Sequence, residues 1–180
     1  MDKRVEANRE TRLRIIKAVV GLLESKNLSD ISVTDIVSEA HVARASYYRN
    51  FSSKEEVLLE AGRMIIDDFG RSMSDIEGEC GGYEGVLRAF RYFLQYREPL
   101  LRFHRTGFTG IYEGLFQDYV EGRMRASADD GASRYRASFF SGALFSVYVA
   151  WLEGGMEESP EEMARLFCSM AEGGEGPKAA

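Results

Sequence analysis

The stretch SVTDIVSEAHVARASYYRNFSSKEEV, residues 32–57, contains two helix-start signals with a short segment between them. Ser32 can cap a helix whose N3 residue, Asp35, reciprocates, and Ser53 and Glu56 repeat this spacing. The segment between them, residues 40–51, has room only for a tight turn and a brief helix. The helix that starts at Ser32, the turn and the brief helix within residues 40–51 together predict a helix-turn-helix motif. In this motif the second helix enters the DNA major groove.

In order and without gaps, this stretch resembles the TetR family of transcriptional regulators. The resemblance rests on residues 32–37, 40–42, 46–51 and 53–57, and it covers the N-terminal third of the chain. Further on, the chain matches that family only in the number and length of its helices. The resemblance implies that double-stranded operator DNA is a partner, with Arg44, Ala45 and Ser46 at base edges. It implies that Thr34, Tyr48, Asn50 and Lys54 lie on or near the DNA backbone and that Ile36, Val42, Tyr47 and Phe51 are core residues.

The side-chain chemistry agrees with part of this assignment. Arg44 can donate two hydrogen bonds to guanine, and the Tyr48 hydroxyl can donate to a phosphate oxygen. Lys54 would place a cation in the first turn of a helix, where the helix dipole disfavours it unless a phosphate binds there. The alternative to a role in DNA binding is a purely structural one. In that case the aromatic side chains pack in the protein core, and Arg44 is a solvated surface charge.

Two residues depart from the family pattern. His41 occupies the turn position usually held by glycine, and histidine tolerates a positive φ better than most residues. Ala43 replaces the serine or threonine that usually caps the recognition helix, and such a loss costs about 1 kcal/mol. We therefore expect a strained turn and a recognition helix that orders fully only on DNA.

The fold class is all-α, because strand signals are nearly absent and apolar residues recur at helical spacing. The first helix is expected over residues 8–25 with Leu13, Ile16, Val20 and Leu23 on one face, followed by a short helix to Ala40 and a long one from Ser53 that ends before Gly78. Further helices are expected at about 83–97, 99–106, 110–127, 133–153 and 160–171. The expected domains are a helix-turn-helix domain over 1–52, a ligand-binding and dimerisation domain over 53–172, and a disordered tail over 173–180.

Composition narrows the class of protein. The charged N-terminus is followed by no apolar segment, which predicts a cytoplasmic protein with no membrane partner. Two cysteines support neither a disulfide framework nor a clustered zinc site, so we expect no metal and no cofactor. The net charge of −6 argues against binding to nucleic acid, but residues 1–60 hold 10 basic and 10 acidic side chains. The acidic excess therefore belongs to the remainder of the chain.

Aromatic residues are concentrated in the C-terminal part, with 16 of the 21 between Tyr83 and Trp151. An aromatic-lined cavity is a common form of small-molecule site, and the resemblance implies an unidentified small-molecule ligand. The alternative is a well-packed bundle without a cavity. The residues expected to line the pocket are Phe90, Phe93, Phe103, His104, Phe108, Tyr112, Phe116 and Phe140.

The segment over residues 138–148 is apolar around most of its helical circumference, which requires burial on more than one side. A partner subunit would supply the second side, and the resemblance implies a homodimer formed by the last two long helices. The residues expected at this interface are Phe139, Gly142, Ala143, Ser146, Val147, Trp151, Met163, Leu166, Phe167 and Met170.

The function implied is that of a sequence-specific regulator, a repressor released from its operator when a ligand tilts the helix from Ser53. Two alternatives share the fold: an activator, and a dimeric DNA-binding protein that responds to no ligand. An enzyme that uses the aromatic pocket is a rival of another class. Because the sequence has no Gly-x-Ser-x-Gly, His-Glu-x-x-His or phosphate-loop motif, we expect no catalytic residues.

Overall fold

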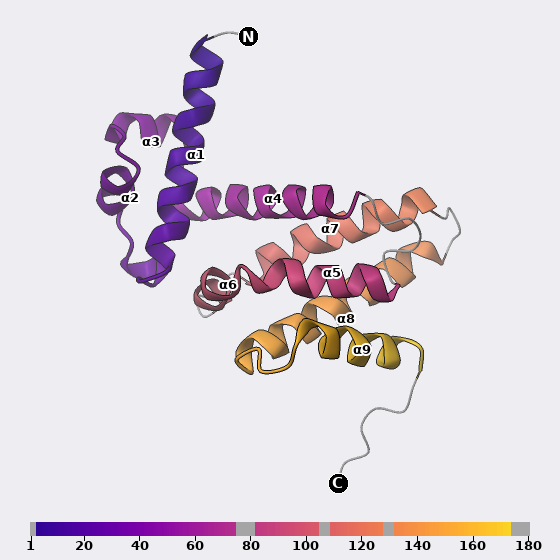
Figure 1. Cartoon of the computed structure of the whole chain (residues 1–180). Helices are drawn as coiled ribbons and strands as arrows, with labels where there is room; N and C mark the ends of the chain where they lie inside the picture. Colours follow the sequence, from indigo (N-terminus) through magenta and orange to yellow (C-terminus); the bar gives the residue numbers. More distant parts are fainter. Residues whose placement is uncertain (1–2, 75–81, 105–108, 128–131, 174–180) are drawn as a thin grey trace. The chain divides into compact units, whose positions relative to one another are not determined.

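The computed structural model describes residues 3–74, 82–104, 109–127 and 132–173. Within these ranges every regular element is a helix, which confirms the all-α prediction (Figure 1). The elements are α1 (Lys3–Leu23), the 3₁₀ turn η1 (Leu28–Asp30), α2 (Val33–Glu39), α3 (Arg44–Asn50), α4 (Lys54–Ser72), α5 (Tyr83–Leu94), α6 (Arg97–His104), α7 (Thr109–Ser127), α8 (Ser133–Glu153) and α9 (Pro160–Ala171).

Helix starts marked by capping residues were predicted best. Ser32 and Asp35 form the expected capping box at α2, and Ser159 with Glu162 forms another at α9, where Pro160 occupies the first turn. The predicted bounds of α8 and α9 are confirmed. The expected start of α1 at residue 8 was wrong, because the preceding residues of good helix propensity extend the helix back to Lys3. The prediction for α5 was also too long by three residues, and η1 was not predicted.

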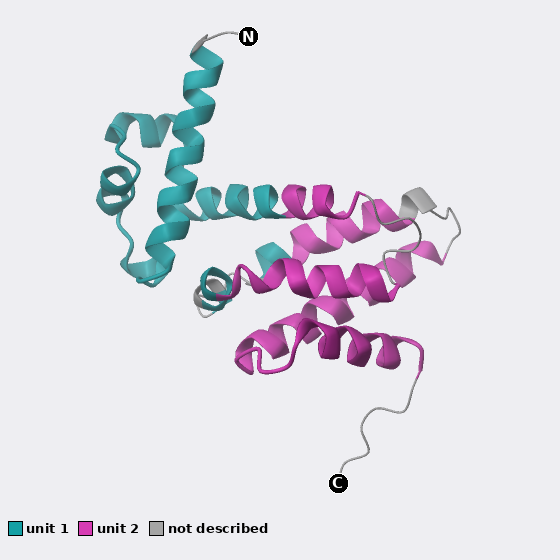
Figure 2. Cartoon of the chain, in the orientation of Figure 1, with its two compact units in different colours: residues 1–65, 98–112 teal, residues 66–97, 113–180 magenta. Residues whose placement is uncertain are grey.

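Two compact units emerge from the contacts within the chain (Figure 2). The first comprises residues 1–65 and 98–112, and the second residues 66–97 and 113–180. The division falls inside α4, so the N-terminal part of this helix belongs to the first unit and its end to the second. The domain boundary expected at residue 53 and the disordered tail expected over 173–180 stay predictions.

The core of the first unit joins α1 to the helix-turn-helix. Ile15, Ile16, Val19 and Leu23 of α1 are buried, and Val20 packs partly buried against them, so the expected apolar face is confirmed except at Leu13 and is widened by Ile15 and Val19. They pack in one cluster with residues of α2, α3 and the start of α4, including Ile36, Tyr47, Phe51, Val57 and Leu58. The expected core roles of Ile36, Tyr47 and Phe51 are confirmed, and Val42 is half-buried against the cluster.

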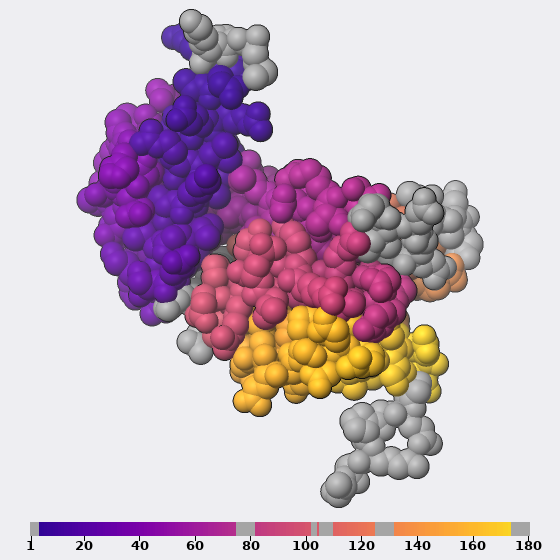
Figure 3. All heavy atoms as spheres, viewed as in Figure 1, coloured from indigo at the N-terminus to yellow at the C-terminus, as the bar shows by residue number. Residues whose placement is uncertain are grey.

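Ring contacts hold the second unit together. Phe69, near the end of α4, lies 4.9 Å from the Phe93 ring of α5 and 5.3 Å from the Tyr119 ring of α7, measured between centroids. Gly70 permits this crossing, because a Cβ at this position would lie 3.0 Å from the Tyr119 ring. Helices α5 and α9 lie side by side, and their side chains meet along their length in the space-filling view (Figures 1 and 3). In the described part of the chain, no helix is long and apolar enough to cross a membrane.

Candidate nucleic-acid interface

The turn between α2 and α3 has the strained geometry expected from its sequence. His41 has φ 51°, which is a left-handed conformation that favours glycine. The guanidinium of Arg14, on α1, donates to the His41 backbone oxygen at 2.5 Å, and the Val42 N–H donates to the Val37 oxygen at 3.0 Å. The first of these hydrogen bonds is made to His41 itself, and the second closes the turn around it. Together they stabilise the turn and offset part of the conformational strain at His41.

The start of α3 has no side-chain cap. Ala43 is the N-cap residue, with φ −68° and ψ 144°, and no side chain accepts from the first-turn N–H groups. This confirms the departure expected at Ala43. The helix is held mainly by its buried side, where Tyr47 is 1% exposed.

The opposite side of α3 is open to a partner. Arg44, Ala45, Tyr48 and Arg49 are exposed there, and Tyr48 retains 54% of its accessible surface. Arg49 was not among the predicted contacts. The 100° turn per residue of an α-helix places it beside Ala45 and on the side away from Tyr47, so helical periodicity would have found it. Ser46 is half-buried at the edge of this face and accepts from Arg49 at 3.2 Å.

The predicted DNA residues Arg44, Thr34 and Tyr48 are brought together. One terminal nitrogen of Arg44 donates to the Thr34 hydroxyl at 3.2 Å, and the other donates to the Tyr48 hydroxyl at 3.1 Å. The Arg44 Cζ also lies 5.6 Å from the centroid of the Tyr48 ring, within the range of a cation–π contact. All three side chains are exposed, so this cluster is available to a partner.

Two other predicted DNA residues are engaged inside the domain. Asn50 is only 7% exposed, and its side-chain amide donates to the Ser46 backbone oxygen at 2.8 Å. The Lys54 ammonium donates to the backbone oxygens of Leu28 and Ile31 at 2.6 and 2.8 Å. These bonds explain a cation in the first turn of α4 without a phosphate. The DNA contacts implied for Asn50 and Lys54 stay predictions that compete with these internal roles.

Hydrogen bonds at the helix starts shift two carboxyl pKa values. The pKa of Asp35 is held well below its ordinary value, chiefly by the Ser32 side chain, then by the Ser32 N–H and Lys26. The pKa of Glu56 is lowered by the Ser52 side chain and N–H. Glu56 was expected to reciprocate with Ser53, but it accepts from Ser52 at 2.7 Å (N–H) and 2.6 Å (hydroxyl) instead, whereas Ser53 caps the Glu56 N–H as predicted.

The residues predicted to line a ligand pocket have several separate environments. In the second unit, Phe93 and Phe116 lie 6.0 Å apart in the ring cluster around Phe69, Phe90 packs edge-on against Trp151, and Phe140 packs against Phe167. In the first unit, Tyr112 packs against the core and His104 is half-buried. Phe108 and the side chain of Phe103 lie outside the described residues.

The predicted dimer residues divide by exposure. Trp151, Met163 and Phe167 are buried within the subunit itself, and the Trp151 indole N–H donates to the Glu158 oxygen at 3.1 Å. Phe139 is 67% exposed, and Leu166 and Met170 are each 41% exposed. Ser146 is exposed, and Gly142, Ala143 and Val147 are half-buried. An apolar surface of α8 and α9 is therefore left open in the single chain.

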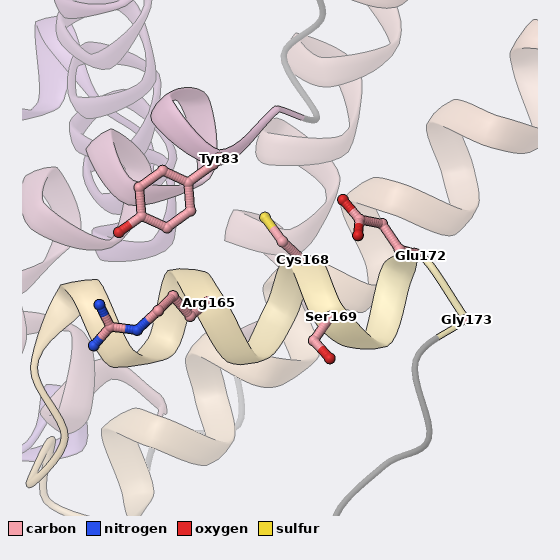
Figure 4. A pocket seen from close by; sticks show the side chains of 6 residues that line it. All are labelled: Tyr83, Arg165, Cys168, Ser169, Glu172 and Gly173. Atoms are coloured by element: carbon pink, nitrogen blue, oxygen red, sulfur yellow. The ribbon is translucent and has the colours of Figure 1, made fainter.

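A shallow depression of about 530 Å³ lies between the start of α5 and the end of α9 (Figure 4). Its lining carries one cation, Arg165, one anion, Glu172, and the thiol of Cys168, whose pKa is raised by burial and then by Glu172. A raised pKa leaves little reactive thiolate. It contains none of the predicted pocket residues. Among the described residues, no group of three or more His, Cys, Asp or Glu side chains could hold a metal ion.

Comparison with protein families matches both parts of the chain. Residues 15–61 match the family described as bacterial regulatory proteins, tetR family, and residues 83–173 match a transcriptional regulator C-terminal region. An uncharacterized HTH-type transcriptional regulator, YerO, of Bacillus subtilis (strain 168) is 32% identical over 73 residues, which are 41% of this chain. The aligned part spans only 25% of that relative's length.

Solved structures of similar fold cover nearly the whole chain. A TetR transcriptional regulator from Streptococcus agalactiae 2603V is 18% identical, with a TM-score of 0.65 over 93% of this chain and 96% of its own. NalD, the secondary repressor of a multidrug efflux pump in Pseudomonas aeruginosa, is 17% identical, with a TM-score of 0.64 over 97% and 100%. RolR with the ligand resorcinol is 14% identical, with a TM-score of 0.64 over 92% and 89%.

These identities show the fold alone, whereas the family matches cover the helix-turn-helix and most of the helices that follow it. The fold and the family are those of a transcriptional regulator. The chain belongs to the TetR family of bacterial transcriptional regulators.

Proposed function

We propose that this regulator is a homodimeric repressor that binds operator DNA through α3 and leaves it when a small, largely apolar ligand binds the second unit. The observation that carries the proposal is the exposed face of α3, where Arg44, Tyr48 and Arg49 lie around the small residue Ala45. A small residue between long donors lets a helix approach base edges closely. The arginines supply donors for guanine or phosphate oxygens.

The charge of the first unit supports the same partner. Arg9 and Lys17 of α1 are exposed, in addition to the arginines of α3. Neutralisation of phosphates by such side chains supplies affinity that does not depend on sequence, and contacts to base edges add specificity. A regulator of chromosomal genes acts where the DNA is, so the proposal places this protein in the bacterial cytoplasm.

The open apolar surface of α8 and α9 supports the homodimer. Phe139, Leu166 and Met170 expose large apolar side chains, and the small residues Gly142 and Ser146 lie on α8 about one and two turns after Phe139. Small residues let two helices approach closely, and burial of exposed apolar surface drives association. Two recognition helices in such a dimer would read half-sites roughly 34 Å apart.

The ligand part of the proposal rests on the aromatic cluster of the second unit. Ring contacts link four aromatic side chains, those of Phe69, Phe93, Phe116 and Tyr148. A small aromatic molecule that entered this cluster would exchange contacts between these rings for contacts between the rings and itself. Phe69 lies on α4, which also belongs to the first unit, so movement of this helix would pass a signal between units. The binding of resorcinol by RolR suggests phenols as the first compounds to test.

Selection from a randomised duplex pool tests DNA recognition. The protein should enrich one sequence with approximate two-fold symmetry, hereafter the enriched duplex; failure to enrich any sequence would overturn the proposal.

A thermal-shift screen of phenols and fatty acids then tests the ligand. At least one compound should raise the melting temperature and release the enriched duplex, and for tenfold release it must favour the DNA-free form by about 1.4 kcal/mol. If stabilising compounds leave the complex intact, the ligand-independent alternative replaces the ligand part of the proposal.

A further inference from the structure

We infer that Thr34 and Tyr48 are positioning residues for Arg44, whose guanidinium they hold in the orientation in which it meets a base edge. The inference rests on the proposed function. The family resemblance implies that Thr34 and Tyr48 lie on or near the DNA backbone. The role inferred here is a different one, because the two hydroxyls affect DNA recognition by orienting Arg44.

The geometry fixes the guanidinium from two directions. Thr34 is in the first turn of α2, and Tyr48 lies one turn along α3 from Arg44. The two terminal nitrogens of Arg44 donate to these hydroxyls at 3.2 and 3.1 Å, one bond to each helix of the motif. The Arg44 Cζ also lies 5.6 Å from the centroid of the Tyr48 ring, within the range of a cation–π contact. A planar group with two anchored nitrogens has a defined orientation.

The anchored guanidinium keeps enough donors to read DNA. A guanidinium carries five N–H donors in a rigid fork, and the two bonds described use one on each terminal nitrogen. The donors that remain can still make the paired contact to guanine O6 and N7. An exposed arginine otherwise loses rotamer freedom when it binds, so anchoring it beforehand reduces this entropic cost.

The two hydroxyls can still contact the DNA backbone. A hydroxyl that accepts from a guanidinium retains its own hydrogen for another acceptor, such as a phosphate oxygen. A direct phosphate contact would survive the removal of Arg44, whereas a positioning effect would not. Comparison of the same substitution with and without Arg44 therefore separates the two roles.

The experiment is a double-mutant cycle on the ratio of affinities for the enriched duplex and a random duplex. Thr34→Val and Tyr48→Phe each remove a hydroxyl while nearly preserving shape, and both are made alone and with Arg44→Ala. With Arg44 present, each should lower the ratio roughly threefold to tenfold, the size expected for one hydrogen bond. In the Arg44→Ala background each should change it by less than about twofold.

Controls and a second readout keep the outcomes distinct. Thr34→Ser, which unlike Thr34→Val keeps the hydroxyl, should have the wild-type ratio of affinities. Tyr83→Phe on α5 should also leave this ratio unchanged. Without DNA, ¹⁵N relaxation of the Arg44 Nε–H should show a more mobile side chain in the Thr34→Val, Tyr48→Phe double variant than in the wild type. Equal mobility, or equal losses of the ratio in both backgrounds, overturns the inference while the proposed function stands. If the wild type enriches no sequence, both are overturned.

Discussion

The Lys54 ammonium donates to the backbone oxygen of Leu28 at 2.6 Å, and it makes a second bond to Ile31 at 2.8 Å. Leu28 and Ile31 are both buried, so these bonds tie the loop after α1 to the start of α4. Lys54→Met should lower the free energy of unfolding by about 2 kcal/mol, because two carbonyls lose a charged donor. Urea unfolding measures this, with the exposed Lys17→Met as control.

The same variant separates the two roles of Lys54. The internal role predicts a salt dependence of DNA binding like that of the wild type. A salt slope shallower by about one unit, with unchanged stability, would instead assign the ammonium to a phosphate.

His41 has φ 51° in the turn between α2 and α3. Glycine adopts this conformation without the steric cost of a Cβ, so His41→Gly should raise the free energy of unfolding by about 1 kcal/mol. The bond from Arg14 is to the backbone and should survive the substitution. Gly155→Ala, at φ 88°, should have the opposite effect, and both changes are measured as shifts of the thermal midpoint. A less stable His41→Gly would mean that the imidazole contributes more than the strain costs.

The sequence predicted well those features that local chemistry determines. Ser32 and Ser53 mark helix starts because a hydroxyl cap needs only residues within one turn. The inward orientation of Lys54 was missed because it depends on the backbone oxygens of Leu28 and Ile31. Such partners are distant in sequence and become visible only in the fold.

The capping box at α2 predicts a loss of stability in acid. The pKa of Asp35 is lowered in the folded protein, so its ionised form stabilises the fold above the carboxyl's ordinary pKa of about 3.9. This stabilisation is lost progressively as the pH falls below that value toward the lowered pKa. Asp35→Asn should therefore reduce stability at about pH 7 more than at about pH 3, as measured by urea unfolding. An equal loss at both pH values would contradict this, and the exposed Asp67→Asn is the matched control.

Gly142 provides a test of the dimer that is separable from folding. Within the described residues, a Cβ at Gly142 would meet no atom within 4 Å beyond its chain neighbours and the backbone of its own helix. Gly142→Arg should therefore fold as a single chain but sediment as a monomer, whereas Gly142→Ala should remain a dimer. Circular dichroism confirms that both variants are helical. If a folded Gly142→Arg still sediments as a dimer, the interface lies elsewhere.

Recognition of DNA sequence through Arg44 is the central claim, and titration of Arg44→Ala tests it most directly. The measured quantity is the ratio of affinities for the enriched duplex and a random duplex at one salt concentration. A paired contact from arginine to guanine is worth about 1 to 3 kcal/mol, so the ratio should fall by roughly fivefold to 150-fold. The exposed Arg63→Ala on α4 should leave it unchanged. An Arg44→Ala ratio equal to that of the wild type would contradict the account, because Arg44 would then not read sequence.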